Sequence, residues 1–302
     1  MSHVPPHREQ ASREGEFPSL APVDVEDFAA AGSDAVSHSL AVLSRVYHYN
    51  HWIFDSIREF LGQDVLEVGS GVGNITQFLL NARRLVCLEP FGPYREYLAR
   101  RFAQHLNVTV VGRTLEDFAR ESRVGQSDRS EAEDGRKAGG EDKRTGGPEN
   151  GTSSSLPPVL PSSRPSFDSV VCLNVLEHIS DDTAALAAMR DMLAPGGKAI
   201  VLVPALPAIY GELDRAMGHV RRYTLASLRR AFHAAGLKCI YGRYFNLVGV
   251  LGWWWNGCIR RRTTIPAKLT VRFDRLAPIL AAVERIIPPL VGQSVLAVGV
   301  AR

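Results

Sequence analysis

A short apolar run that breaks abruptly into glycines is the feature that most constrains the fold of this chain. Residues 64–74 read DVLEVGSGVGN, and the helical pattern ITQFLLNA follows directly. This order predicts a buried strand, a tight turn and a helix. Glycines in such a turn adopt positive φ angles and let the backbone approach a ligand closely. The segment therefore predicts a ligand-binding turn at the carboxyl end of a strand in an open α/β sheet.

Strand and helix patterns alternate through most of the chain. Apolar residues recur at helical spacing over residues 39–61, which predicts one helix before the glycine turn. The expected later strands are RLVCLEP, NVTVVGRTL, FDSVVCL, GGKAIVLVPA, KCIYGRYFN and SVLAVGVAR. The expected helices are YREYLARRFAQ, EDFARES, DDTAALAAMRDML and LASLRRAFHAAGL. This alternation predicts an α/β fold with a Rossmann-like, doubly wound and mostly parallel sheet.

Two segments lack the apolar residues that a folded core requires. They are an N-terminal arm over residues 1–35 and an insert at about residues 121–165, both rich in Gly, Ser, Pro and charge. Because such segments bury too little surface to offset their ordering entropy, we expect both to be disordered. A single domain over residues 36–302 remains, interrupted by the insert. A regulatory or partner-binding role is the alternative to a tolerated surface loop for the insert.

Composition narrows the class of protein. The formal net charge is only +3, so no nucleic-acid partner is expected. The four cysteines are far apart and form no C-x-x-C pair, which favours a reduced, cytoplasmic protein, and no metal site is expected. The N-terminus has no apolar segment typical of a secretory signal. The oligomeric state is not predicted.

The spacing of the glycines distinguishes between two kinds of cofactor. Dinucleotide sites use G-x-G-x-x-G, whereas here the pattern is G-x-G-x-G and Asn74 occupies the place of the third glycine. Glu67, two residues before the first glycine, would repel a pyrophosphate but suits an ammonium or a sulfonium. Glu89 ends the next expected strand, where a carboxylate can accept hydrogen bonds from both hydroxyls of a ribose. A solvated acid at a strand end is the alternative for Glu89.

VLEVGSGVGN, LEP, FDSVVCLNVLEHI and LAPGGKAIVLVPA occur in the order of the motifs of class I S-adenosylmethionine-dependent methyltransferases, and the chain resembles this family from about residue 49 onward. The resemblance implies S-adenosylmethionine as cofactor and an antiparallel last strand, SVLAVGVAR. Many relatives carry an acid near the position of Asn174. The cofactor site implied by the resemblance comprises the residues of the glycine turn and of three later strand ends, namely Glu67, Gly69, Ser70, Gly71, Gly73, Asn74, Glu89, Pro90, Leu115, Glu116, Asn174 and Val175.

Two histidines are candidates for the catalytic base. Methyl transfer to a hydroxyl requires alignment of donor and acceptor and benefits from a base that removes the proton. His178 follows the fourth expected strand, and in the similar quinone-pathway O-methyltransferases such a Glu-His pair lies beside the substrate. His219 belongs to a block that resembles a bacterial subgroup with D-x-x-x-G-H-x-R-R-Y. The alternative for His178 is a hydrogen-bonded residue that anchors its loop.

The same block supplies the expected acceptor-binding residues. Charged and aromatic side chains close together after the fifth expected strand suit a polar or anionic acceptor. An ion-pair network that fastens a lid is the alternative. The expected acceptor-binding residues are Tyr210, Asp214, Arg221, Arg222 and Tyr223.

Two aromatic segments carry further expectations. Tyr49, Asn50 and Trp52 resemble the helix that closes over the cofactor in this group, and core packing is the alternative for Trp52. Residues 252–256 read GWWWN and precede three consecutive arginines, a pattern found at membrane interfaces. A cap over the acceptor pocket and a dimer contact are the alternatives for this second segment.

The sequence thus predicts an S-adenosylmethionine-dependent methyltransferase that methylates an oxygen of a small molecule, a sugar or a lipid-linked glycan. A cofactor-binding regulatory or assembly subunit without catalysis is a second interpretation. A nicotinamide-dependent dehydrogenase is a third, and the glycine spacing and Glu67 disfavour it.

Overall fold

The computed structural model describes residues 35–122 and 166–301. The predicted arm and insert lie almost entirely outside these ranges. The exceptions are Ala35, which begins the first helix, and residues 121–122, which end a helix over 115–122.

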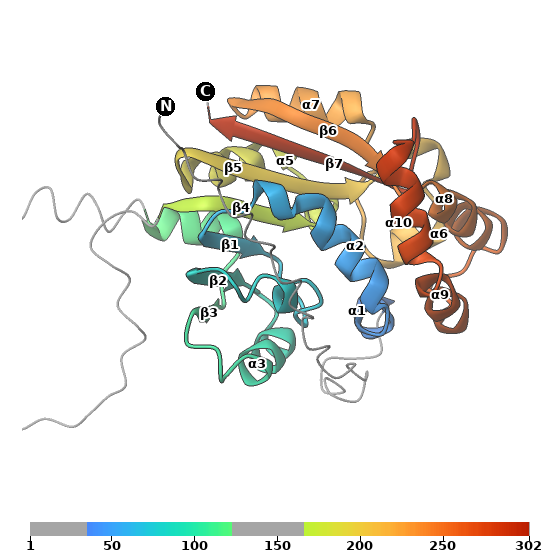
Figure 1. Ribbon diagram of the computed structural model, residues 1–302, viewed down its shortest axis with the longest axis horizontal. Helices are drawn as coiled ribbons and strands as arrows, with labels where there is room; N and C mark the ends of the chain where they lie inside the picture. The colour runs from blue at the N-terminus through green and yellow to red at the C-terminus, as the bar shows by residue number, and fades with distance from the viewer. Residues whose placement is uncertain (1–34, 123–165, 302) are drawn as a thin grey trace, which may run out of the picture.

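Seven strands form one sheet in the order β3-β2-β1-β4-β5-β7-β6 (Figure 1). Neighbours from β3 to β5 pair in parallel, and β7 is antiparallel to both β5 and β6. This arrangement confirms the predicted doubly wound sheet with an antiparallel last strand. The strands are β1 (Asp64–Val68), β2 (Arg84–Leu88), β3 (Val108–Val111), β4 (Phe167–Leu173), β5 (Leu193–Pro204), β6 (Leu237–Phe245) and β7 (Ser294–Ala301).

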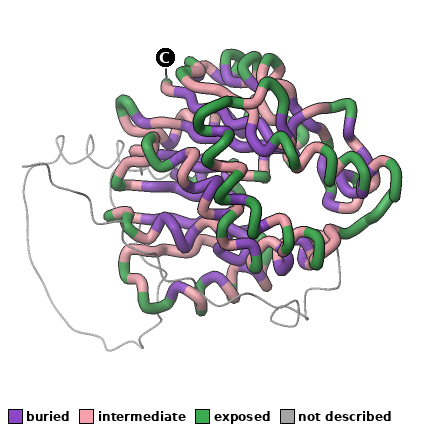
Figure 2. Tube along the Cα trace, turned by 45° about the vertical axis from the view of Figure 1, so that its right-hand side comes forward, coloured by how far each residue is buried: buried purple, intermediate pink, exposed green. Residues whose placement is uncertain are grey.

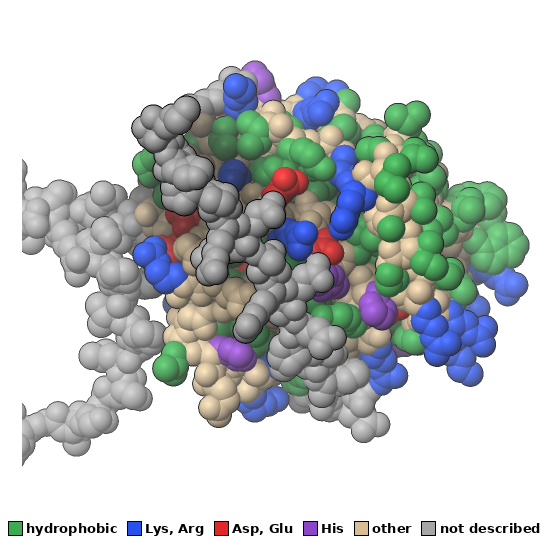
Figure 3. Space-filling model, viewed as in Figure 1, with side chains coloured by type: hydrophobic (Ala, Val, Ile, Leu, Met, Phe, Trp, Pro, Cys, Tyr) green, Lys and Arg blue, Asp and Glu red, His purple; other side chains and the backbone are tan. Residues whose placement is uncertain are grey.

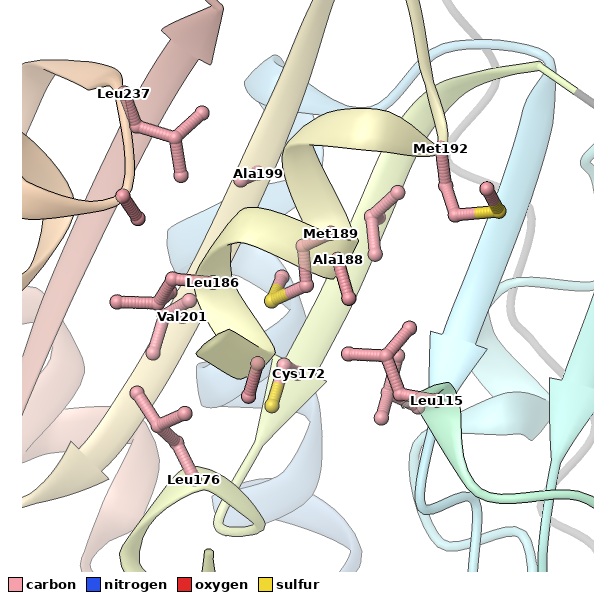
Figure 4. Close-up of a cluster of buried hydrophobic side chains, with 14 of the residues drawn as sticks. Leu115, Cys172, Leu176, Leu186, Ala188, Met189, Met192, Ala199, Val201 and Leu237 are labelled. Carbon is pink, nitrogen blue, oxygen red and sulfur yellow. The ribbon is translucent and has the colours of Figure 1, made fainter. Parts of the chain in front are cut away.

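Helices cover both faces of the sheet, which explains why the central strands are nearly continuous apolar runs. Figure 2 shows the strands as mostly buried segments in the middle of the molecule. One core lies between the sheet and the helices 115–122, α5 (Asp182–Asp191) and α7 (Leu225–Ala234), and Figure 4 shows part of it. The other core lies beneath α2 (Tyr47–Ile57), α3 (Gly92–Arg101) and α10 (Ala277–Ile286).

The remaining elements gather where the parallel strands end. Because β7 runs opposite to the other strands, its first residue lies at the same edge as their last residues. The sheet order reverses between β1 and β4, so the crevice expected for a ligand opens at this edge. The elements there are η4 (Leu176–His178), η5 (Pro207–Ile209), α6 (Glu212–Ala216), α8 (Leu247–Trp254), η6 (Trp255–Ile259) and α9 (Ala267–Asp274). In the described part of the chain, no helix has the length and apolarity needed to cross a membrane.

Two predicted helices differ from the structure. Residues 39–61 do not form one helix but α1 (Ala35–Ser44), α2 and the short 3-10 turn η2 (Arg58–Phe60). The break occurs where the Asn50 side chain donates to the carbonyl of Leu43 at 2.7 Å and Val46 leaves helical geometry.

The segment ITQFLLNA forms only the 3-10 turn η3 (Thr76–Phe78). The Thr76 hydroxyl donates to Glu67 at 2.6 Å, and the Gln77 amide donates to the carbonyl of Asn74 at 2.8 Å. Side chains that bond to nearby groups in this way compete with the helical ladder, which is why the apolar spacing did not produce a helix.

Candidate active site

The glycine turn after β1 has the backbone that the sequence predicts. Gly69, Gly71 and Gly73 have φ angles of 68°, 56° and 86°, a region that side chains other than glycine rarely adopt. A Cβ atom on Gly69 would lie 2.4 Å from Cγ2 of Val175. The turn therefore packs directly against the segment that follows β4.

Two buried carboxylates flank this turn. Glu89 accepts hydrogen bonds from the backbone N–H groups of Gly71 at 2.8 Å and Phe91 at 2.9 Å. Glu67 accepts from the Thr76 hydroxyl, and burial raises its pKa to about 7. Burial also raises the pKa of Glu89, although the two backbone N–H groups oppose this shift. Glu89 thus joins the ends of β1 and β2, while Glu67 is bonded within the protein interior.

Helix α1 covers the turn. Leu40 would lie 3.4 Å from a Cβ atom on Gly71, and the Asn74 amide donates to the Leu40 carbonyl at 3.2 Å. The other amide atom, Asn74 Oδ1, is buried and receives no hydrogen bond from the described residues. A buried acceptor without a donor is costly, so this atom suits a ligand that brings an N–H group.

The other predicted cofactor residues lie in different environments. Ser70 is buried in the turn and Pro90 is exposed next to Glu89. Leu115 is 3% exposed and packs in the core near Cys172 (Figure 4), whereas Glu116 is exposed. Contacts of these four residues with a cofactor stay predictions.

A cavity of about 460 Å³ begins beside the glycine turn. Leu40, which lies against Gly71, lines the cavity, so the cavity and the turn share this side chain. Asn174, which follows β4 with a φ of 55°, also lines it. Most of its lining is apolar, contributed by α1, α8 and α9. The apolar lining includes Val36, Leu43, Val46, Leu213, Met217, Val248, Leu251, Ile265, Leu269 and Phe273.

A buried polar cluster lies beside the cavity, and its members His219 and Glu177 line the cavity. His219 Nδ1 lies 2.8 Å from Asp214 Oδ1, and His219 Nε2 lies 3.9 Å from Glu177 Oε1. The side chains of Asp214 and Glu177 are fully buried. Neither oxygen of Glu177 receives a hydrogen bond from another described residue, and burial raises the pKa of this carboxyl to about 8.

Asp214 is held as an ionised acceptor. Besides His219, it accepts from the guanidinium of Arg222 at 2.9 Å, from the indole N–H of Trp253 at 3.0 Å and from the N–H of Gly211 at 3.0 Å. Burial alone would raise the pKa of Asp214, but these donors hold it below its ordinary value. Since an ionised carboxylate only accepts, the hydrogen in the Asp214–His219 contact belongs to His219 Nδ1.

His178 stands next to this cluster. Its ring centroid lies 4.9 Å from that of His219, and desolvation together with the His219 ring lowers its pKa to about 4. Ligand atoms of Glu177, His178 and His219 all lie within 4.8 Å of one another. The structure therefore brings both predicted base candidates to the same cavity.

Only part of the predicted acceptor block reaches the cavity. Arg222 lines it, but Tyr210, Asp214, Arg221 and Tyr223 do not. The Tyr210 hydroxyl donates to the His219 carbonyl at 2.7 Å, and Arg221 and Tyr223 both bond to Asp182 at 2.9 Å. These contacts fit the alternative expectation of a network that fastens the segment.

The two aromatic segments, residues 49–52 and 252–256, also place some side chains in the core and others at the cavity. Trp52 is 5% exposed and packs on Phe245 with ring centroids 4.3 Å apart, which fits the core alternative. Trp253 lines the cavity, as a cap over an acceptor pocket would. Tyr49 also lines the cavity, and its closing over the cofactor stays a prediction. Glu177 and Trp253 were not among the predicted site residues, although Glu177 adjoins His178 in sequence and Trp253 lies in the tryptophan run.

Comparison with known proteins agrees with this geometry. A family model described as a methyltransferase domain matches residues 46–241, more than half of the chain, so the chain belongs to this family. No curated protein matched. The chain is a class I S-adenosylmethionine-dependent methyltransferase, and S-adenosylmethionine is its cofactor.

Comparison with solved structures found matches at low identity. A chain of the Haloferax volcanii complex that contains the Trm112 methyltransferase activator is 16% identical with a TM-score of 0.53, covering 92% of this chain and 99% of that chain. A Leishmania major S-adenosylmethionine-dependent methyltransferase is 15% identical, with a TM-score of 0.45 and coverages of 73% and 74%. One from Clostridium acetobutylicum is 11% identical, with a TM-score of 0.46 and coverages of 84% and 91%.

Proposed function

We propose that this methyltransferase transfers the methyl group to a hydroxyl oxygen of an acceptor with a largely apolar body. The observation that carries the proposal is that His219, Glu177 and Asn174 line one cavity whose other lining residues are mostly apolar. Among the expected acceptors, a small molecule, a sugar or a lipid-linked glycan, this lining favours one that carries an apolar chain or ring.

The residues around the turn fit the cofactor, which supplies an already activated methyl group. Glu89 would accept the ribose hydroxyls with the lone pairs that Gly71 and Phe91 leave free. The orphaned Asn74 Oδ1 would accept from the ammonium group. Leu115 and Glu116 would border the adenine, and Asn174 with Val175 the methionine end.

The chain's own contribution to the transfer is positioning and proton removal. Because His219 Nδ1 carries the hydrogen bonded to Asp214, Nε2 is the ring nitrogen that faces Glu177 and the cavity. This nitrogen would take the proton of the acceptor hydroxyl, and the ionised Asp214 would stabilise the imidazolium. Glu177, protonated near neutral pH, would donate a hydrogen bond that orients the acceptor oxygen.

The test is methylation of an extract fractionated by polarity. Purified protein is incubated with S-adenosylmethionine carrying a deuterated methyl group, and mass spectrometry identifies labelled products. The expected product lies in the lipid or apolar fraction and carries the label on oxygen. A product labelled on nitrogen or carbon, or labelled only in the polar fraction, would overturn the proposal.

A second way to activate the hydroxyl rests on a separate observation. Glu177, His178 and His219 form a two-histidine, one-carboxylate set whose ligand atoms lie within 4.8 Å of one another, and His219 is oriented from behind by Asp214. Such sets bind Zn²⁺, Mn²⁺ or Fe²⁺, and a carboxylate behind a histidine ligand is typical of metal sites. A cation there would bind the acceptor hydroxyl and lower its pKa.

Metal analysis distinguishes the two mechanisms. The base mechanism predicts that protein dialysed against EDTA contains no stoichiometric metal and keeps its activity. If activity disappears on dialysis and returns with one divalent cation, while the Glu177→Gln variant no longer retains that metal, the cation replaces His219 as the activating group.

We also propose that the protein works in a reducing compartment such as the cytoplasm. Cys87 and Cys172 are buried in β2 and β4, and Cys239 and Cys258 form no disulfide in the structure. Unpaired thiols support this location. Titration of four free thiols in freshly purified, unreduced protein is the expected result.

A further inference from the structure

The surface made by α8, η6, α9 and α10 is unusually apolar. Fourteen of the eighteen large hydrophobic side chains that are exposed in the described residues lie between residues 247 and 291. Figure 3 shows hydrophobic side chains over the right-hand side of the molecule, where α8 and α10 lie in Figure 1. Monomeric proteins seldom expose contiguous apolar surface of this kind without a binding function. We call the exposed side chains of residues 247–291 the apolar–basic face.

Helix α10 illustrates how this surface arises. Its inner side holds Ala277 and Glu284, which are buried. Its outer stripe is formed by Ile279, Val283 and Ile286, each at least half exposed, and the exposed Ile287 and Leu290 continue it. The helix is therefore apolar on the side that faces away from the core, opposite to the usual pattern of a surface helix.

All exposed charge on this face is positive. The face carries seven exposed basic side chains, Arg260, Arg261, Arg262, Lys268, Arg272, Arg275 and Arg285. Residues 247–291 contain only two acidic residues. Both are buried, and both accept hydrogen bonds from the backbone. Asp274 accepts from the backbone N–H of Tyr49, and Glu284 accepts from those of Asn246 and Leu247.

The basic residues lie among the exposed tryptophans. Arg260 stacks over the Trp255 ring with the guanidinium carbon 5.7 Å from the ring centroid, and Trp254 is also exposed. A hollow between η6 and α9 is lined by four basic side chains and no acid, namely Arg260, Arg262, Lys268 and Arg272. Tryptophan at an apolar–polar boundary and clustered cations are two features with which proteins bind lipid headgroups.

We propose that the apolar–basic face docks on a membrane that contains anionic lipids. The apolar stripe would enter the boundary between headgroups and acyl chains, and the seven cations would neutralise lipid phosphates. A second copy of this chain fits the face poorly, because a twofold contact would set these seven cations against seven identical ones. Helices α8, α9 and α10 have eight to ten residues, so the mode of contact is interfacial rather than spanning.

Docking would also explain how the acceptor reaches the cavity, a step that rests on the proposed function. Val248, Leu251 and Leu269 belong both to the exposed face and to the cavity lining. The apolar wall of the cavity is therefore continuous with the face, and an acceptor with an acyl or polyprenyl chain could pass from the bilayer without crossing water.

Vesicle flotation tests the proposal without any methyl transfer. The full chain is mixed with vesicles of phosphatidylcholine alone, or of phosphatidylcholine with phosphatidylglycerol, at low and high salt. We expect flotation with the anionic vesicles and at least tenfold weaker partition at high salt, because salt screens exposed charges. Absence of flotation with anionic vesicles would overturn the proposal.

Matched variants assign the binding to this face. Arg260→Glu with Arg261→Glu and Arg262→Glu, and separately Ile286→Ser with Ile287→Ser and Leu290→Ser, should each weaken partition at least tenfold. The controls are Arg229→Glu with Arg230→Glu on α7, and Leu106→Ser, which change exposed residues elsewhere and should partition as wild type. Calorimetric titration with S-adenosylmethionine verifies that every variant is folded.

Two outcomes would contradict the assignment. If both sets of variants float like wild type, the face does not touch the membrane. If light scattering shows a dimer that the Ile286→Ser set converts to monomer, the face is an interface between copies of the chain. Neither outcome bears on the methylation assay, so failure of docking and failure of the proposed function are distinguishable.

Discussion

His219 lies between two buried carboxylates, with Nδ1 2.8 Å from Asp214 Oδ1 and Nε2 3.9 Å from Glu177 Oε1. The two carboxylates differ in their partners. Asp214 receives three further hydrogen bonds, whereas Glu177 receives none from other described residues. One carboxylate therefore fixes the tautomer of the ring, and the other remains available to a ligand in the cavity.

This asymmetry separates the two histidines. We expect His219→Gln to lower kcat by about 100-fold or more, because the substituted side chain has no base of suitable pKa. His178→Gln, the matched comparison in the same cavity, should lower kcat less than about tenfold, since no carboxylate of the described residues forms a hydrogen bond that orients its ring. Affinity for S-adenosylmethionine, measured by calorimetry, should remain within a factor of about two in both. A larger loss for His178→Gln than for His219→Gln would exchange the two roles.

The buried Glu177 makes stability depend on pH. Its pKa is about 8 in the folded protein, against an ordinary value of 4.5, so the folded state holds an extra proton between these values. The free energy of unfolding should therefore fall as pH rises from about 4.5 to 8. Glu177→Gln removes the ionisable carboxyl, so no buried charge forms at high pH. The variant should therefore be more stable than wild type at about pH 9, by up to a few kcal/mol, but not at about pH 5.

Urea denaturation of wild type and Glu177→Gln at both pH values measures the difference. Glu116→Gln, a change of an exposed acid, serves as the control and should show no such pH-dependent gain. If Glu177→Gln and wild type respond identically to pH, Glu177 is ionised in the folded protein at neutral pH.

Glu89 should carry much of the cofactor affinity. Its carboxylate is anchored by two backbone N–H groups at the end of β2, so removing it deletes the acceptor and loosens the glycine turn. We expect Glu89→Ala to weaken S-adenosylmethionine binding beyond calorimetric detection, a loss of at least about 100-fold for a charged, bidentate contact. Glu96→Ala, an exposed acid on α3, should bind like wild type. If Glu89→Ala bound S-adenosylmethionine with wild-type affinity, Glu89 would not be the residue that holds the ribose.

The sheet was predictable because its signals are local. Apolar runs bounded by turns fixed the strands, and the final SVLAVGVAR strand pairs antiparallel as the family resemblance implied. The prediction of a helix after the glycine turn was wrong. Apolar periodicity does not reveal that the side chains of Thr76 and Gln77 form hydrogen bonds with Glu67 and Asn74. The spacing of apolar residues indicates which residues are buried. It does not indicate whether side-chain hydrogen bonds compete with the backbone hydrogen bonds of a helix.

The site was predictable in part for a related reason. The sequence predicted His178 and His219 separately as candidates for the catalytic base. The sheet topology places both at the carboxyl ends of the parallel strands. It could not show that Arg221 and Tyr223 turn to Asp182 and away from the cavity, because neighbouring residues on a loop point in different directions. Trp253 was foreseen only as one of several alternatives, since its bond to Asp214 joins residues 39 positions apart.

The close contact between Gly69 and Val175 gives the last prediction. A methyl group on Gly69 would lie 2.4 Å from Val175 Cγ2, and the backbone φ of 68° is strained for alanine. Gly69→Ala should therefore lower the free energy of unfolding by about 2–3 kcal/mol and displace the turn that holds the cofactor.

Two further variants separate the contributions to this loss. Val175→Ala in the Gly69→Ala background relieves the clash but not the φ strain, so it should restore about half of the lost stability. Gly252→Ala in α8, where the added Cβ would have no described neighbour within 4 Å beyond its own helix backbone and adjacent residues, should be neutral or stabilising by up to about 1 kcal/mol. If Gly69→Ala is as stable as Gly252→Ala in chemical denaturation, the turn does not require glycine, and the backbone argument for the cofactor site loses its support.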